Sequence, residues 1–291
     1  MNDTAIDWCE KTWNPITGCL HGCEYCYARK QSQRFNGHYD FFEEKNIKDH
    51  CVTVYKLDVP FDFLTKAGKL VSAPFPFGFS PTFHRYRLYD PRKLQKLNKA
   101  QRIFVGSMTD MFAAYIPDEW IGEVFKACFK APQHCYMFLT KNPKRYGEFL
   151  RGDYFFEYIR PHIPNEWHTT YGNMLFGATV TSNQDLKYCH ELDRIDFLSI
   201  EPLIEELDCE NMLSVENPAY NAFFKLRDSH YSKYEWIIIG AETGNRKNKI
   251  VPRREWIEKI VKECQEWDIP VFMKNNLASI WGEPLIQELP F

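Results

Sequence analysis

The stretch "PDEWIGEVFKACFKAPQHCYMFLT" (residues 117–140) carries the two patterns that decide the fold of this chain. Its first part repeats apolar residues at helical spacing, which predicts an amphipathic helix whose buried face is made of Trp120, Ile121, Val124, Phe125, Cys128 and Phe129. Its end, "CYMFLT", is an uninterrupted apolar run of strand length, which is typical of a strand buried on both faces of a parallel sheet. A helix followed by such a strand predicts the βα unit of an α/β protein.

The same two patterns recur along the chain. Further apolar runs of strand length lie at residues 102–107, 175–181, 196–202, 236–242 and 270–275, and a second amphipathic helix is expected over 252–267. Two more strands are expected at 11–15 and 80–85, with a helix over 24–35. This alternation predicts an α/β fold built as a TIM-like parallel (β/α) barrel, complete or partial, of six to eight strands.

The length of 291 residues favours one domain over residues 1–291 with a sizeable core. Three segments do not follow the alternation of strands and helices, at about 36–79, 151–173 and 204–234. Barrel folds vary most in the loops that follow their strands. We therefore expect these segments to be inserted loops of a single barrel domain.

Charge and cysteine content restrict the partners and the compartment. The net charge of −3 provides no overall basic surface for nucleic acid or for an anionic membrane. The sequence shows neither a secretion signal nor an apolar run of membrane-spanning length, so we expect a cytoplasmic protein with no membrane partner. In that reducing compartment the ten cysteines would be free thiols or metal ligands.

Three of the cysteines are gathered in "GCLHGCEYCYAR" (residues 18–29), where Cys19, Cys23 and Cys26 have the spacing C-x3-C-x2-C. Structural zinc sites and ferredoxin-type clusters use four protein ligands, so a set of three leaves one position unaccounted for. A zinc site completed by His21 or Cys9, and a group of core cysteines, are the alternatives to an open cluster. No second compact cluster is visible, and we expect Cys128, Cys135 and Cys264 to be small buried residues.

The cysteine spacing, with the aromatic Tyr25 directly before the third cysteine, resembles the signature of the radical S-adenosylmethionine (SAM) superfamily. The resemblance implies a [4Fe–4S] cluster bound by the three cysteines, with SAM on the fourth iron. It implies reductive cleavage of SAM to a 5′-deoxyadenosyl radical that abstracts a hydrogen atom. It also implies an electron donor such as flavodoxin or ferredoxin.

Longer stretches extend this resemblance. "NPITGCLHGCEYCYAR" (residues 14–29) is similar to the cluster loop of spore-photoproduct-lyase-like proteins. Over the whole chain, the motif order is similar to a phage- and prophage-associated family of radical-SAM-type proteins. The shared motifs are "TWNPxTGC", "FVGSMxDMF", "LTKNPxR", "TVxxNQ", "LSIEPL" and "GxExG", which begin here at residues 12, 104, 139, 179, 198 and 240.

Polar residues follow several predicted strands, at the barrel end where catalytic groups collect. Each of them alone could equally be a helix cap or a solvated loop residue. We predict that Tyr25, through its backbone, and four polar residues contact SAM, these four being Ser107, Thr140, Lys141 and Thr181. We predict catalytic roles toward SAM or substrate for Glu201 and Glu242. The superfamily's Gly-Gly-Glu motif is missing after the second strand, and "GAE" occurs only after the seventh, so its role is not transferred to Glu242.

The substrate class is suggested by basic segments after two strands, at residues 140–145 and 245–254, and by the aromatic residues of the first insertion. Phosphate contacts and stacking surfaces are what base-directed enzymes need, although both basic segments could simply be solvated helix starts. Together with the family resemblance they favour a nucleic acid, nucleobase or nucleotide substrate. The alternative function is a non-catalytic zinc or Fe–S module in a nucleic-acid-binding or phage protein.

Overall fold

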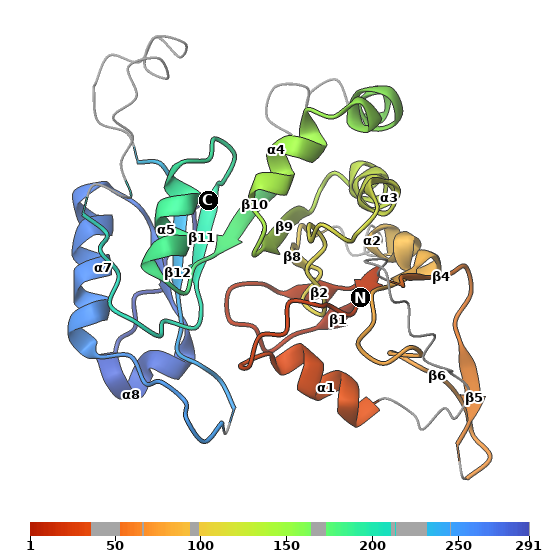
Figure 1. The fold of residues 1–291 in the computed structure, drawn as a ribbon, viewed down its shortest axis with the longest axis horizontal. Coiled ribbons are helices and arrows are strands. Elements are labelled where there is room, and N and C mark those ends of the chain that lie inside the picture. Colours follow the sequence, from red (N-terminus) through yellow and green to blue (C-terminus); the bar gives the residue numbers. More distant parts are fainter. Residues whose placement is uncertain are drawn as a thin grey trace. The chain divides into compact units, whose positions relative to one another are not determined.

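The computed structural model of this chain describes residues 1–35, 53–65, 67–93, 99–163, 173–210, 213, 232–244 and 246–290. The chain divides into two compact units (Figure 1). The first unit consists of residues 1–5, 9–138 and 148–174, and the second of residues 6–8, 139–147 and 175–291. Each unit is described separately below.

The first unit contains a mostly parallel set of strands. They follow the order β1 (Asn2–Asp3), β2 (Lys11–Trp13), β8 (Arg102–Val105) and β9 (Cys135–Thr140), of which the last two residues of β9 are assigned to the second unit. β2, β8 and β9 are parallel, whereas the short β1 runs antiparallel to β2. The strands predicted at 11–15, 102–107 and 135–140 are therefore confirmed.

The second unit holds a fully parallel set of strands. Its strands follow the order β10 (Met174–Thr179), β11 (Phe197–Ile200), β12 (Trp236–Ile239) and β13 (Val271–Met273). All residues of β11, β12 and β13 are buried, as expected for strands covered on both faces. The parallel α/β prediction is thus confirmed. No strand pairing among the described residues closes a barrel.

Two small sheets belong to the first unit. One has the order β3 (Ile16–Thr17), β7 (Thr82–His84) and β4 (Tyr55–Leu57), and the other pairs β5 (Asp62–Leu64) with β6 (Leu70–Ser72). The strand predicted at 80–85 exists as β7, but its assignment to the barrel is wrong. The buried His84 bonds Thr17 through Nε2 at 2.9 Å, so β7 is committed to β3 and not to the parallel strands.

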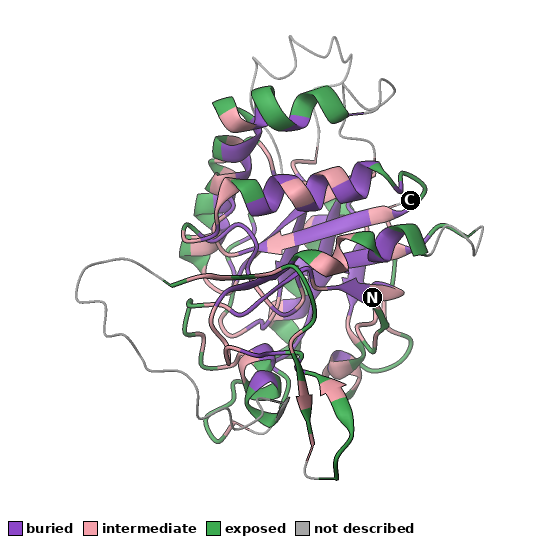
Figure 2. Ribbon diagram, turned by 90° about the vertical axis from the view of Figure 1, so that its right-hand side faces the viewer, coloured by how far each residue is buried: buried purple, intermediate pink, exposed green. Residues whose placement is uncertain are grey.

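The helices carry the predicted amphipathic pattern. They are α1 (Tyr27–Phe35), α2 (Asp90–Lys93), α3 (Asp118–Phe129), α4 (Lys144–Leu150), α5 (Asn183–His190), α7 (Arg254–Glu266) and α8 (Ala278–Trp281). α3 buries all six predicted apolar side chains. α7 packs Ile257, Ile260, Val261 and Cys264 onto the core of the second unit. Figure 2 shows helices with buried and exposed faces beside buried strands.

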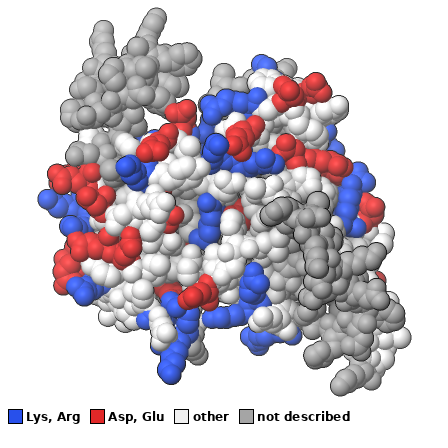
Figure 3. All heavy atoms as spheres, viewed as in Figure 1, with Lys and Arg blue, Asp and Glu red and all other residues white. Residues whose placement is uncertain are grey.

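Short helices complete the described chain. They are η1 (Arg85–Tyr89), η3 (Phe155–Ile159), η4 (Arg160–His162) and η6 (Asn275–Leu277). Two of them, η3 and η4, occupy the segment 151–173 that we predict to be an insertion. Basic and acidic side chains alternate on the face seen in Figure 3. No helix among the described residues has both the length and the apolar character that a membrane crossing requires.

Candidate functional site

Residues 18–29, here called the cluster loop, connect β3 to the start of α1. A tight turn brings the second and third cysteines together, since the backbone N–H of Cys26 donates to the carbonyl oxygen of Cys23 at 3.2 Å. All three cysteine side chains of the loop are half-buried free thiols. They are therefore shielded in part from solvent but still accessible to a ligand.

The cluster loop is anchored on the segment that follows β8. The backbone N–H of Gly18 donates to Met108 at 2.9 Å, and Thr109 Oγ1 donates to the carbonyl oxygen of Gly18 at 2.6 Å. Asn14 tightens this contact, because its Oδ1 accepts from the backbone N–H of Met108 at 3.0 Å. The motifs at residues 12–19 and 104–112 thus meet, and they fix the start of the loop.

Gly18 is required by both conformation and space. Its φ of +86° lies in the left-handed region that favours glycine. A Cβ atom at this position would lie 2.2 Å from the carbonyl oxygen of Ser80, which is fixed backbone. Gly22 also has a positive φ, of +71°, but a Cβ atom there would meet nothing within 4 Å.

Two cysteine sulfurs accept hydrogen bonds from the surrounding protein. Tyr115 Oη donates to Cys19 Sγ at 3.3 Å, and the backbone N–H of Arg29 donates to Cys26 Sγ at 3.3 Å. Burial raises the pKa of the Cys19 thiol, and the nearby Asp110 and Cys23 add to this effect, while the bond from Tyr115 opposes it. A bound cation would favour the thiolate form that ligation needs.

Two residues could supply the fourth ligand of a zinc site. His21 Nε2 lies 2.8 Å from Asp110 Oδ2, which leaves Nδ1 as the ring nitrogen that could bind a metal. Cys9 is buried and only 6% exposed. Among the described residues, no group of three or more His, Cys, Asp or Glu side chains is placed to hold a metal ion, and this includes the three cysteines of the cluster loop, whose side chains do not converge on one point in this structure. The donor set of three half-buried thiols with N–H and O–H donors to sulfur suits an Fe–S cluster chemically.

The two predicted SAM contacts of the first unit lie beside these cysteines in sequence or space. Tyr25 is half-buried within the cluster loop. The Ser107 hydroxyl is bonded to the side chain of Asn14 at 3.1 Å, and the Ser107 carbonyl accepts from Tyr27 Oη at 2.5 Å. Ser107 therefore stabilises the cluster loop through its hydrogen bonds to Asn14 and Tyr27.

The remaining described cysteines behave as core residues. Cys128, Cys189, Cys209 and Cys264 are buried, as we predicted for Cys128 and Cys264, and burial raises the pKa of each thiol. Cys135 is only half-buried, although burial still raises its pKa to about 12. Cys51 lies outside the described residues.

In the second unit, three predicted SAM contacts lie at strand ends, and two of them cap turns. Thr140 is buried, and its Oγ1 accepts from the backbone N–H of Asn142 at 2.9 Å. Thr181 Oγ1 donates to Asp185 Oδ2 at 3.0 Å, within the capped start of α5. Lys141 is half-buried. The two threonine hydroxyls are therefore engaged in local contacts of the loops after their strands, while the N-cap of α5 is Ser182.

The two predicted catalytic carboxylates are both paired with cations. Lys274 Nζ donates to Glu201 Oε2 at 2.7 Å, while Glu201 Oε1 is buried without a hydrogen-bond partner among the described residues. Glu242 is only 2% exposed and accepts from Nε and Nη2 of Arg246, each at 2.8 Å. Gly240 makes room for the first pair, since a Cβ there would lie 2.9 Å from Lys274 Cδ. Each carboxylate is thus held as part of an ion pair.

The basic segment 245–254 is less available for phosphate than its composition suggests. Arg246 binds Glu242, and Arg254 Nε donates to Glu258 Oε1 at 2.7 Å. Arg253 lies over the ring of Trp256. These arginines contact neighbouring side chains of the second unit, as expected if the segment is an ordinary helix start.

Sequence reasoning did not predict the contacts of four residues that shape these sites. Asn14 and Tyr115 hold the cluster loop, and Lys274 and Arg246 neutralise the two carboxylates. Asn14 stands inside the "TWNPxTGC" motif, so the motif itself was the available signal. Tyr115 and Arg246 lie outside the strand-end positions that guided the prediction, and only the folded chain reveals their partners.

Comparisons with solved structures find spore photoproduct lyase at low identity. A cysteine-to-serine mutant of that enzyme matches with 11% identity and a TM-score of 0.47, and a cysteine-to-alanine mutant with dinucleoside spore photoproduct matches with 9% identity and a TM-score of 0.49. Both matches cover 94% of this chain and 78% of the other. A likeness of this size does not establish a shared activity. No curated protein matches the chain significantly.

A family model matches nearly the whole chain. It covers residues 3–284, and its description is "Protein of unknown function (DUF5131)". The matched range contains the cluster loop and all the strand ends discussed above. This chain therefore belongs to the DUF5131 family.

Proposed function

We propose that this protein is a radical SAM enzyme whose [4Fe–4S] cluster is bound by Cys19, Cys23 and Cys26. The observation that carries the proposal is the anchored cluster loop, in which three half-buried thiols stand at the C-x3-C-x2-C spacing and two sulfurs accept hydrogen bonds. Hydrogen bonds to sulfur are one means by which proteins tune such clusters. When bound, the cluster and SAM would supply an electron and a 5′-deoxyadenosyl radical for hydrogen abstraction.

The residues around the loop have positioning roles in this proposal. Gly18 allows the chain to pass Ser80 closely, and Asn14 joins the loop to the segment after β8. Arg29 holds the loop from within, because its Nη2 donates to the carbonyl oxygen of Cys19 at 3.1 Å. These contacts keep the first and third cysteines at fixed places on the backbone.

Roles for the other predicted residues are part of the same proposal. Tyr25 and Ser107 would contact SAM beside the loop. Contacts of SAM with Thr140, Lys141 and Thr181 are proposed on the sequence resemblance alone. Glu201 and Glu242 would act on SAM or on substrate, and a flavodoxin or ferredoxin would donate the electron. Membership of a phage-associated group, and one domain over residues 1–291, stay predictions.

A nucleobase or nucleotide is the substrate class that we favour. The support is the resemblance of residues 14–29 to spore-photoproduct-lyase-like proteins and the basic segment at 140–145. The competing function is a zinc or Fe–S module without catalysis. A zinc site would take its fourth ligand from Nδ1 of His21, whose Nε2 is bonded to Asp110, or from the buried Cys9.

Metal analysis of single cysteine variants tests the cluster. The purified chain is reconstituted anaerobically with iron and sulfide, and iron, acid-labile sulfide, zinc and absorbance near 400 nm are measured. We expect about four iron and four sulfide per chain, and a large loss of both in Cys23→Ala. Cys135→Ala is the matched control, because it removes a half-buried thiol outside the loop.

Two results would refute the proposed cluster. One is stoichiometric zinc with no iron in the chain purified without oxygen. The other is equal iron loading of the Cys23→Ala variant and the unmodified chain.

A further inference from the structure

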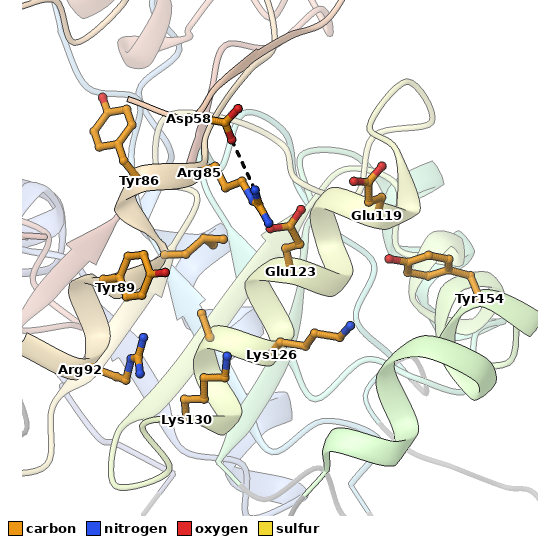
Figure 4. Close-up of a pocket in the computed structure, with 12 residues that line it drawn as sticks. Asp58, Arg85, Tyr86, Tyr89, Arg92, Glu119, Glu123, Lys126, Lys130 and Tyr154 are labelled. Carbon is orange, nitrogen blue, oxygen red and sulfur yellow. Dashed lines mark hydrogen bonds and ion pairs between the residues drawn. The ribbon is translucent and has the colours of Figure 1, made fainter. Parts of the chain in front are cut away.

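A groove of about 640 Å³ lies in the first unit, bordered by η1, α2 and α3 (Figure 4). None of the residues that line it belongs to the cluster loop, and none has a role in the function proposed above. Its walls carry three tyrosines, four cationic side chains and three carboxylates. These charges are not spread evenly, so the two ends of the groove differ in net charge.

At one end the charges neutralise each other. Arg85 Nε donates to Glu123 Oε2 at 2.7 Å, and its Nη1 lies 3.5 Å from Asp58 Oδ1. These pairs raise the pKa of the Arg85 guanidinium, with Glu123 contributing most. Outside the groove lining, Lys56 lies 3.4 Å from Glu119. The carboxylates at this end therefore already have cationic partners.

At the other end positive charge accumulates. Lys126 and Lys130 stand four residues apart at the end of α3, so both lie on the same face of the helix. Figure 4 shows Arg92 of α2 on the Lys130 side of the groove, beside Tyr89, whereas the Lys126 side chain points toward Tyr154. Within the described chain, neither Arg92 nor Lys126 forms an ion pair with a carboxylate. Lysines at a helix end also complement the helix dipole, but that effect does not explain the arginine on the facing element.

A stacking surface adjoins these cations. Tyr89 is 59% exposed, which is unusual for a large ring, and the Arg92 guanidinium lies 4.9 Å from its ring centroid. An arginine that stacks on a ring through its plane can still donate from its N–H edge to a phosphate. Bases stack on tyrosine rings and on guanidinium planes in the same way. The groove thus combines an anion site with a platform for an aromatic ring.

We propose that this groove binds a nucleotide, with its phosphate between Arg92 and Lys130 and its base against Tyr89. The phosphate ester of a free nucleotide and that of a single-stranded oligonucleotide share this chemistry, and the groove volume suits a ligand of nucleotide size. The site is separate from the cysteines, so its occupation does not depend on the iron, on SAM or on the activity proposed above.

Equilibrium binding to the full chain without iron or SAM tests this site. The probe is fluorescein-labelled oligothymidylate of twelve nucleotides, followed by fluorescence anisotropy at several salt concentrations. Thymidine 5′-monophosphate and thymidine are the competitors. The variants are Arg92→Gln with Lys130→Gln, Tyr89→Leu, and the control Lys262→Gln, whose side chain is 79% exposed on α7 of the second unit.

The proposal expects the double variant to bind at least tenfold more weakly and, because one phosphate contact is lost, to lose about 0.7 from the slope of log affinity against log salt. Tyr89→Leu should weaken binding about fivefold, and Lys262→Gln should leave it unchanged. If thymidine 5′-monophosphate competes and thymidine does not, a free nucleotide with its phosphate ester is sufficient for binding. If the oligonucleotide binds and neither competitor displaces it, the ligand is a single strand. Equal binding by the double variant and the unmodified chain, or no binding of either probe at low salt, would overturn the proposal.

Discussion

At the scale of single residues, Gly18 shows how one backbone position shapes the cluster loop. Its left-handed φ and its closeness to Ser80 exclude any side chain, while Gly22 has a similar φ in open space. A substitution at Gly22 would therefore meet only the cost of a left-handed backbone, whereas one at Gly18 would add the cost of a steric clash. Both lie in the same short loop, beside the same cysteines.

We expect Gly18→Ala to destabilise the first unit more than Gly22→Ala does. A left-handed non-glycine residue costs about 1–2 kcal/mol at either position, and the contact with Ser80 adds to this only at residue 18. Urea unfolding of the two metal-free variants and of the unmodified chain measures the difference. Equal losses of unfolding free energy in the two variants would contradict the account of Gly18.

At the scale of secondary structure elements, most of the fold could be predicted from the sequence. The strands β8 to β13 and the buried faces of α3 and α7 follow from apolar runs and helical spacing. The error at residues 80–85 has a physical cause. A three-residue strand carries no signal of its partners, and β7 pairs with β3 and β4, which are both distant from it in sequence.

The candidate site likewise has a part that could be predicted from the sequence and a part that could not. The three cysteines could be recognised from the sequence, because they lie within one short stretch and their spacing is read directly. The partners of Glu201 and Glu242 are not, because Lys274 follows at the end of another strand and Arg246 lies in a loop. The capping box of Ser182 and Asp185 at the start of α5 could be anticipated from the sequence, and the bond from Thr181 Oγ1 to Asp185 competes with a ligand role of Thr181.

The amino ends of β11 and β12 should make stability depend on pH. Burial raises the pKa of Asp196, against opposing effects of Arg194 and the Phe176 N–H, and burial also raises the pKa of the neighbouring Glu235. The folded chain therefore holds the Asp196 proton to higher pH than the unfolded chain, whose aspartates titrate near pH 3.9. Stability contributed by the protonated form falls as pH rises through that window.

Asp196→Asn removes this titration but can still accept the hydrogen bond from the Phe176 N–H, which measures 2.7 Å. The unfolding free energy of the variant minus that of the unmodified chain should increase from about pH 4 upward, by at most about 1.4 kcal/mol per pH unit. Urea unfolding of both chains between pH 4 and pH 7.5 measures it. A difference that stays constant or decreases with pH would show that the pKa of Asp196 is not raised.

At the scale of the whole molecule, the chain combines three sites with different chemistry. The first unit carries the cluster loop and the nucleotide groove, and the second carries the ion pairs at its strand ends. Family membership over residues 3–284 includes all three. The central claim concerns only the first of them, the cysteines of the loop, and it predicts a product that no zinc module would form.

The most direct test is the formation of 5′-deoxyadenosine. The reconstituted chain is incubated anaerobically with SAM and dithionite, and the nucleoside is quantified by chromatography and mass spectrometry beside Cys23→Ala and Cys135→Ala. Our account predicts 5′-deoxyadenosine from the unmodified chain and from Cys135→Ala, and only background from Cys23→Ala. Background levels from a chain that carries its full iron and sulfide would contradict the account.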